Sequence, residues 1–178
     1  MENTTDNTRG RMMTGMFRDR TSAERAYNSL SSRGYTKDDV NIIMSDDTRK
    51  RHFANTTTET ELGNKALEGA GAGSAIGGTL GAIVGALAAL GTSVALPGLG
   101  LIVAGPLAAG LAGAGAGGLT GGLLGALVGS GIPEERAKVY ESGVKEGGIV
   151  MGVTPRNEED ARYFETEWRN SNGEHIYR

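Results

Sequence analysis

Few residues of this 178-residue chain have the types and spacing that catalysis or metal binding requires. Pairs of adjacent carboxylates could supply general acid and base groups, and they are Asp38 with Asp39, Asp46 with Asp47, and Glu134 with Glu135. Adjacent residues point to different sides of a helix or strand, so turn and cap roles explain these pairs better. The two histidines, His52 and His175, lack the spacing of a ligand pair, and the chain has no cysteine. We therefore assign no catalytic residue and no metal ligand.

A glycine pattern of the kind that binds dinucleotides, G-x-G-x-x-G, occurs at Gly113, Gly115 and Gly118. In that role the pattern follows a strand, opens a helix and has an acidic partner about 20 residues further on. No strand is expected before Gly113, and the local glycine density is enough to generate the match. The same block has no lysine, so it holds no phosphate-binding P-loop. We expect no cofactor.

The charged residues give little indication of a partner. The formal net charge is −3, which does not favour a nucleic-acid partner. The one basic cluster, RKRH at residues 49–52, could contact anionic lipid headgroups, but a solvated linker is the better explanation for so short a run. No small-molecule substrate is indicated. The polar beginning of the chain does not resemble a secretory signal peptide, so we expect a cytoplasmic origin.

The middle of the chain differs chemically from both ends. All 18 Lys and Arg, all 21 Asp and Glu, both His and every aromatic residue lie outside residues 69–132. Within this block only aliphatic residues, Gly, Pro, Ser and Thr occur. The composition indicates two different structural parts rather than one evenly mixed domain.

Glycines recur at every fourth position in two ladders within this block. A glycine inside a helix costs about 1 kcal/mol relative to alanine, so such ladders need compensation from outside the helix. On a helix, a period of four places the glycines on one face, where another backbone can approach closely. We therefore predict a close-packed helical hairpin rather than a flexible linker. Its helix-packing residues are Gly69, Gly73, Gly77, Gly81, Gly85, Gly113, Gly117, Gly121, Gly125 and Gly129.

The segments before and after the block are predicted to form two halves of one small domain. The first half is a strand over residues 12–17, a helix opened by a Thr21–Glu24 capping box and ended at Gly34, and a strand over residues 40–45. The second half is a helix that begins near Pro133, a strand over residues 149–153, and a helix capped by Asn157. Three strands are recognised, and a fourth is not.

We predict an α+β fold, a small ferredoxin-like strand–helix–strand sandwich with an inserted Gly/Ala-rich glycine-zipper helical hairpin. The expected organisation is a disordered tail over residues 1–11, the first half of the α+β domain over 12–45, a linker over 46–68, the hairpin over 69–132, the second half over 133–170 and a tail over 171–178.

The sequence allows two environments for the hairpin, a lipid bilayer or the interior of a soluble oligomer. As helices, residues 69–90 and 107–129 would be about 33 and 35 Å long, against a hydrocarbon thickness of roughly 30 Å. Membrane insertion is marginal because glycine is frequent, yet a solvated hairpin without any charge is implausible. With all Lys and Arg on one side, a spanning hairpin would keep the domain in the cytoplasm. The alternative is a soluble homo-oligomer in which zippers of several chains pack together.

The chain also resembles a known family. Its most specific segments are LPGLG…AGPLAA and GIPEERAKVYESGVKEGG, and together with residues 13–45 they are similar to the bacterial heat-induced general stress proteins. The resemblance covers about residues 13–155 and transfers no catalytic residue. It implies a stress-induced, often membrane-annotated bacterial protein with no established enzymatic role. The sequence therefore predicts a non-enzymatic stress-response protein, associated with the lipid bilayer or, alternatively, a self-assembling scaffold.

Overall fold

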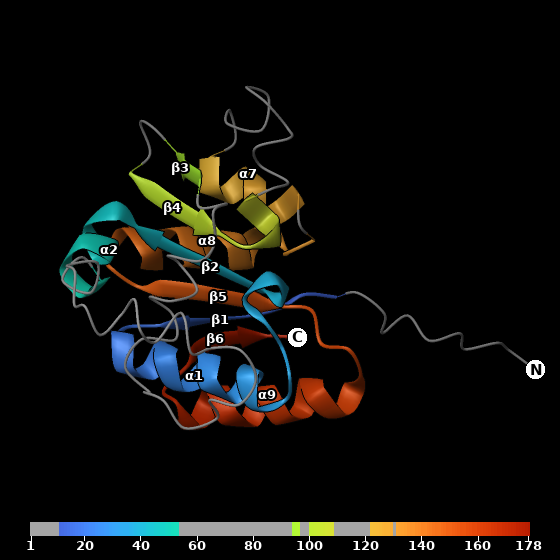
Figure 1. The fold of residues 1–178 in the computed structure, drawn as a ribbon. Helices are drawn as coiled ribbons and strands as arrows, with labels where there is room; N and C mark the ends of the chain where they lie inside the picture. Colours follow the sequence, from blue (N-terminus) through green and yellow to red (C-terminus); the bar gives the residue numbers. More distant parts are fainter. Residues whose placement is uncertain (1–10, 54–93, 97–99, 109–121, 130) are drawn as a thin grey trace, which may run out of the picture.

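A single antiparallel sheet organises the chain (Figure 1). The computed structural model describes residues 11–53, 94–96, 100–108, 122–129 and 131–178. Their six strands follow the order β3-β4-β2-β5-β1-β6, and each neighbouring pair is antiparallel. The strands are Met13–Phe17 (β1), Val40–Ser45 (β2), Val94–Leu96 (β3), Leu101–Ala104 (β4), Ile149–Val153 (β5) and Glu174–Tyr177 (β6). The predicted α+β class and the three predicted strands, β1, β2 and β5, are confirmed.

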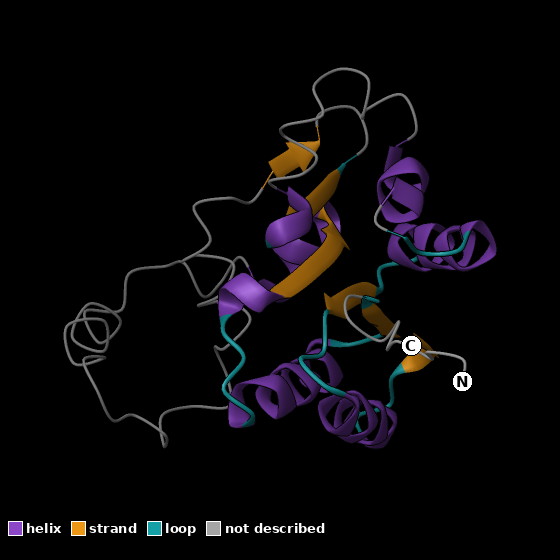
Figure 2. Cartoon of the chain, turned by 90° about the vertical axis from the view of Figure 1, so that its right-hand side faces the viewer, coloured by secondary structure: helices purple, strands orange, loops and turns teal. Residues whose placement is uncertain are grey.

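Helices cover both faces of the sheet, so the described part has three layers (Figure 2). One face packs against Arg20–Ser32 (α1) and Glu158–Asn170 (α9), and the other against Gly122–Gly129 (α7) and Glu134–Lys145 (α8). A short helix, Asp46–Phe53 (α2), follows β2, and a 3-10 turn, Lys37–Asp39 (η1), precedes it. Because the sheet is covered on both faces, nearly every residue of β1, β2 and β5 is buried, including the polar side chains of Thr14 and Asn41.

Methionines fill much of the sheet on both of its faces. Met13, Met44 and Met151 belong to the core under α1 and α9. Met12 and Met16 belong to the core under α7 and α8. All five are at most 8 % exposed. An unbranched thioether side chain adapts to irregular gaps, which suits a strand that must pack against helices on both sides.

The helix caps agree with the sequence in one case and differ in another. Asn157 caps α9 as predicted, since its side chain accepts a hydrogen bond from the N–H of Asp160 at 2.8 Å. The cap of α1 is Asp19 rather than Thr21, and its carboxylate accepts from the N–H of Ser22 at 2.8 Å. Glu24, predicted to close the capping box, instead pairs with Arg20 at 2.7 Å inside the fold. Asp19 is the better cap than Thr21 because its negative charge also interacts favourably with the helix N-terminus.

Two segments predicted to be irregular contain regular structure. Residues 46–53, placed in the linker, form α2, whose Thr48 and Phe53 are buried. Residues 174–177, placed in the tail, form β6 at one edge of the sheet. β6 is irregular: His175 has a positive φ of 50°, and the pairing with β1 shifts register. Its side chains therefore do not follow a simple period of two. Both segments were missed because each has too few apolar residues to show a period.

The middle of the uncharged block contributes strands to the sheet. β3 pairs with β4, and β4 pairs with β2 so that Ile43 lies opposite Val103. These residues lie where the helical hairpin predicted over residues 69–132 would have its turn, and they form strands instead. The difference follows from the β-propensity of the run Leu101–Ala104, which is aliphatic and contains the β-branched residues Ile102 and Val103.

The predicted second hairpin helix, residues 107–129, is not one continuous helix. Gly122 has a φ of +56°, which a right-handed helix does not allow. Downstream of it, Leu123 and Leu127 of α7 are buried in the same cluster as Leu101 and Val103 of β4. The predicted first helix, residues 69–90, lies outside the described residues.

Candidate functional site

The glycine ladders are the site that the sequence singles out, and the structure describes only a small part of them. Gly125 and Gly129 lie in α7. The other eight ladder positions lie outside the described residues. The packing of the two ladders against each other therefore stays a prediction.

The two described ladder glycines lie on the outer side of α7. Leu123 and Leu127 face the sheet, whereas Gly125, Val128 and Gly129 are exposed. Val128 is 41 % exposed, and among the described residues it is the one large hydrophobic side chain that is exposed. No described atom lies within 4 Å of the position that a Cβ would take at Gly125 or at Gly129. Within the described part, this face of α7 is an uncharged strip without a partner.

Gly143, which is not a ladder residue, lies at the closest contact between a helix and the sheet. Gly143 in α8 lies directly over Met16 of β1, so that a Cβ there would overlap the sulfur atom. The missing side chain lets α8 approach the sheet closely. In the sequence, the only signal for this contact is a single glycine inside a helical pattern.

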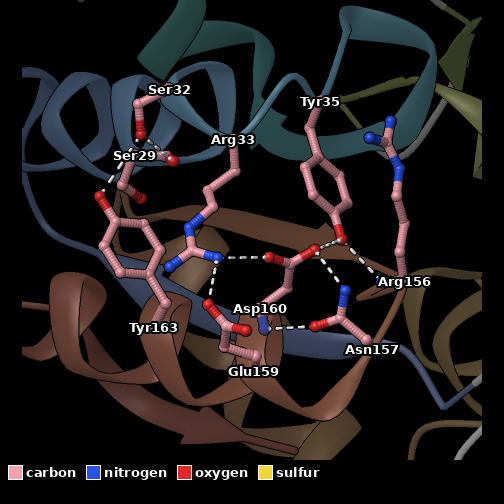
Figure 3. A network of polar contacts seen from close by, with 9 residues as sticks. All are labelled: Ser29, Ser32, Arg33, Tyr35, Arg156, Asn157, Glu159, Asp160 and Tyr163. Carbon is pink, nitrogen blue, oxygen red and sulfur yellow. Dashed lines mark hydrogen bonds and ion pairs between the residues drawn. The ribbon is translucent and has the colours of Figure 1, made fainter.

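A network of polar side chains joins the C-terminal end of α1 to the N-terminal end of α9 (Figure 3). At its centre the Tyr35 hydroxyl donates to the Oδ2 atom of Asp160 at 2.7 Å. The same hydroxyl accepts a hydrogen bond from the backbone N–H of Arg156 at 2.6 Å. Tyr35 and Asp160 are 3 % and 6 % exposed. The two residues are far apart in the chain, and this bond joins the segment after α1 to the first turn of α9.

Two arginines complete the network (Figure 3). Arg33 donates to Asp160 and to Glu159 at 3.1 and 3.0 Å, and its guanidinium lies 4.3 Å from the ring centre of Tyr163. Arg156 lies 4.1 Å from the ring centre of Tyr35 and donates to the carbonyl oxygen of Gly34. Each charged group in the network has a protein partner, so its geometry supports the packing of α1 on α9 rather than acid–base chemistry.

Burial and the neighbouring carboxylate of Asp160 raise the pKa of Tyr35 to about 12. We expect Tyr35→Phe to lower the free energy of unfolding by about 2 kcal/mol at neutral pH, because Asp160 and a backbone N–H each lose a partner. Since the folded pKa lies above the unfolded value of 10.0, this contribution is present below pH 10 and is lost as the pH rises through 12. Urea unfolding at pH 8 and at pH 11 measures the difference.

Tyr163→Phe is the matched control, because the Tyr163 hydroxyl has only a long, exposed contact with Ser32, at 3.4 Å. Its stability should equal that of the original protein at both pH values. If Tyr35→Phe behaved like this control, the proposed role of the Tyr35–Asp160 bond would be wrong.

The carboxylate pairs have turn, cap and ion-pair roles. Asp39 accepts from the backbone N–H of Thr36 at 2.8 Å and closes a capping box around η1, as the sequence analysis preferred. Asp46 pairs with Lys50, and Glu134 pairs with Lys138, each four residues further along its helix. In the described ranges, no three acidic or histidine side chains come together in a way that could hold a metal ion.

The basic cluster is occupied by contacts within the protein. Arg49 pairs with Asp46 at 3.1 Å, and Arg51 donates to the backbone oxygen of Asp47 at 3.4 Å. The backbone oxygen of His52 accepts from Arg20 at 2.8 Å. These contacts stabilise α2 and reduce the positive charge available to lipid headgroups, so the cluster behaves as part of the fold.

The described residues contain no membrane-spanning helix, and known proteins include no match to the chain. Across the part of the chain that the structure describes, no helix combines the length and hydropathy needed to cross a bilayer. Comparison with known proteins finds no matching family, no matching curated protein and no matching solved structure.

Proposed function

We propose that the protein is a non-enzymatic stress-response protein that acts by self-association, with its glycine-rich segment packing between copies of the chain. The stress role rests on the sequence resemblance. A non-enzymatic role is supported by the polar network, by Asp46 and by Glu134, whose charged groups have protein partners within the described residues. We place the protein in the cytoplasm, either free or at the inner face of the membrane.

One observation favours self-association over a membrane-spanning hairpin. In the sequence, residues 54–93 connect Phe53, which is 4 % exposed, to β3, which pairs with β4 in the same sheet. The uncharged residues 69–90 have the length of one crossing, about 33 Å. A single crossing would place Phe53 and Val94 on opposite sides of the bilayer, yet both belong to one folded unit.

Membrane association is the second candidate. In this form the glycine-rich segment would enter the bilayer and return to the same side of it. It is favoured by the complete lack of charge between residues 69 and 132 and by the apolar strip on α7. In this form the lipid bilayer would be the partner, and the folded unit would face the cytoplasm.

For the fold itself, we propose that β1, α1, β2, β5, α9 and β6 constitute a ferredoxin-like unit. The strand order supports this, because the step from β1 to β2 passes over β5, and the step from β5 to β6 passes over β1. Two such interleaved strand–helix–strand steps characterise the split arrangement of that fold. Everything between β2 and β5, including β3, β4, α7 and α8, would then be one insertion.

The two candidates predict different behaviour on purification. A self-associating protein should elute without detergent as one discrete oligomer, and a carbonate wash should release it from cell membranes. A protein embedded in lipid should stay in the membrane pellet after the wash and require detergent. Light scattering coupled to gel filtration gives the mass of the oligomer, and a monomer in the wash would contradict both candidates.

Replacing Gly77 and Gly81 together with leucine tests the ladder directly. If these glycines allow close helix packing, the bulky side chains should push the backbones apart and shift the oligomer toward monomer, although leucine is the better helix former. Gly78→Leu lies off the ladder and is the control, with a smaller expected effect. Equal oligomer mass and equal thermal stability for the double variant and the original protein would rule out the packing role.

A further inference from the structure

A hollow of about 340 Å³ lies between the first half of α8 and the end of β6. It is lined by Pro133, Glu135, Arg136, Val139 and Tyr177. Its volume falls at the lower end of the range of small-ligand pockets. The lining combines apolar groups, an aromatic ring, one guanidinium group and the carboxylate of Glu135, and neither the glycine ladders nor the polar network includes any of these residues.

The guanidinium of Arg136 has no carboxylate partner in the described part of the chain. Four arginines there are half-buried, and Arg20, Arg33 and Arg49 each pair with an acidic side chain. Arg136 instead lies 5.8 Å from the ring centre of Tyr177. A half-buried cation without a counter-charge favours an anion that enters from outside.

A hydrogen bond between α8 and β6, the two elements that line the hollow, holds its walls in place. The Tyr140 hydroxyl, one turn after Arg136 on α8, donates to the backbone oxygen of His175 in β6 at 2.6 Å. Its oxygen also lies 2.9 Å from the hydroxyl of Thr14 in β1. Tyr140 is fully buried, so α8 and β6 stay at a fixed separation, and Arg136 and Tyr177 keep their positions across the hollow.

We propose that this hollow binds a small organic monocarboxylate with a flat apolar body. The carboxylate would accept a bidentate pair of hydrogen bonds from Arg136, which a planar guanidinium is shaped to provide. The apolar body would lie against the Tyr177 ring and the side chains of Val139 and Pro133. Glu135 at the rim carries a negative charge, which disfavours multiply charged anions such as phosphate.

The test uses the full chain and three probes, benzoate, benzyl alcohol and inorganic phosphate, followed by amide chemical shifts in NMR. Benzoate should give saturable shifts at residues 134–139 and 177, with an affinity at least about tenfold higher than that of either other probe. Arg136→Gln should reduce the benzoate affinity by about tenfold or more without changing the melting temperature, since Arg136 makes no ion pair with the described residues. Arg162→Gln on α9, which removes an exposed ion pair with Glu158, is the control and should bind benzoate normally.

Each other outcome overturns the proposal. Shifts that do not saturate by about 10 mM benzoate would mean that no site exists. Equal affinity for phosphate would mean that the apolar wall takes no part. Unchanged benzoate binding by Arg136→Gln would place the ligand elsewhere.

Discussion

Gly105→Ala is expected to lower the free energy of unfolding by about 4 kcal/mol, the largest effect of any single methyl group in the described part of the chain. Gly105 directly follows β4 and has a φ of +95°, and a Cβ there would overlap the backbone oxygen of Val40 at the start of β2. Because the obstacle is backbone, no side-chain rotation relieves it. Urea unfolding followed by circular dichroism measures the loss.

Gly100→Ala separates the two causes of this loss. Gly100, in the turn before β4, also has a positive φ, of 61°, but no described atom lies within 4 Å of its Cβ position. Its alanine variant should lose only the conformational cost, about 1 kcal/mol. If both variants lost the same amount, β4 would not lie against β2, and the helical hairpin predicted from the sequence would regain support.

The second large effect is expected at Gly143, where alanine should cost about 3 kcal/mol. A Cβ at this position would overlap the sulfur of Met16, which is 1 % exposed and surrounded by the core. Either α8 moves away from the sheet or Met16 leaves its rotamer. The loss should appear as a lower midpoint in urea with an unchanged slope.

Ser142→Ala in the same helix is the matched control for Gly143. Ser142 is exposed and makes one long contact with Glu146, at 3.3 Å. Its alanine variant should stay within about 0.5 kcal/mol of the original protein, because helix propensity is all that changes. A Gly143→Ala variant as stable as this control would contradict the close approach of α8 to β1.

Local sequence patterns predicted the elements that have strong periodicity or clear caps. The strands β1, β2 and β5 are aliphatic and methionine-rich runs, and α9 combines the Asn157 cap with Ala161, Phe164 and Trp168 on one face, all buried. These signals are contained within single segments. They need no knowledge of the remaining chain.

The remaining elements depend on partners that lie far away in sequence. β4 is a strand because β2 offers a free edge, and the aliphatic run Leu101–Ala104 taken by itself fits a helix or a strand equally well. β6 is ordered by β1 and by the bond between Tyr140 and His175, more than 30 residues apart.

The candidate sites could be anticipated only in part. The ladder glycines are visible as a period of four in the sequence. The contact of Gly143 with Met16 and the hollow beside Arg136 join residues from separate elements, so no local pattern encodes them.

Oxidation of the methionines in the sheet reports how often the sheet opens transiently. Peroxide oxidises a methionine sulfur to the sulfoxide only when it can reach the atom. Met13, Met16, Met44 and Met151 are at most 1 % exposed, and the chain has no cysteine to react first. The rate at which these sulfurs are oxidised is therefore set by transient opening of the sheet rather than by the native surface. Because a sulfoxide is polar and does not fit the closed core, each oxidation event makes the next opening more frequent.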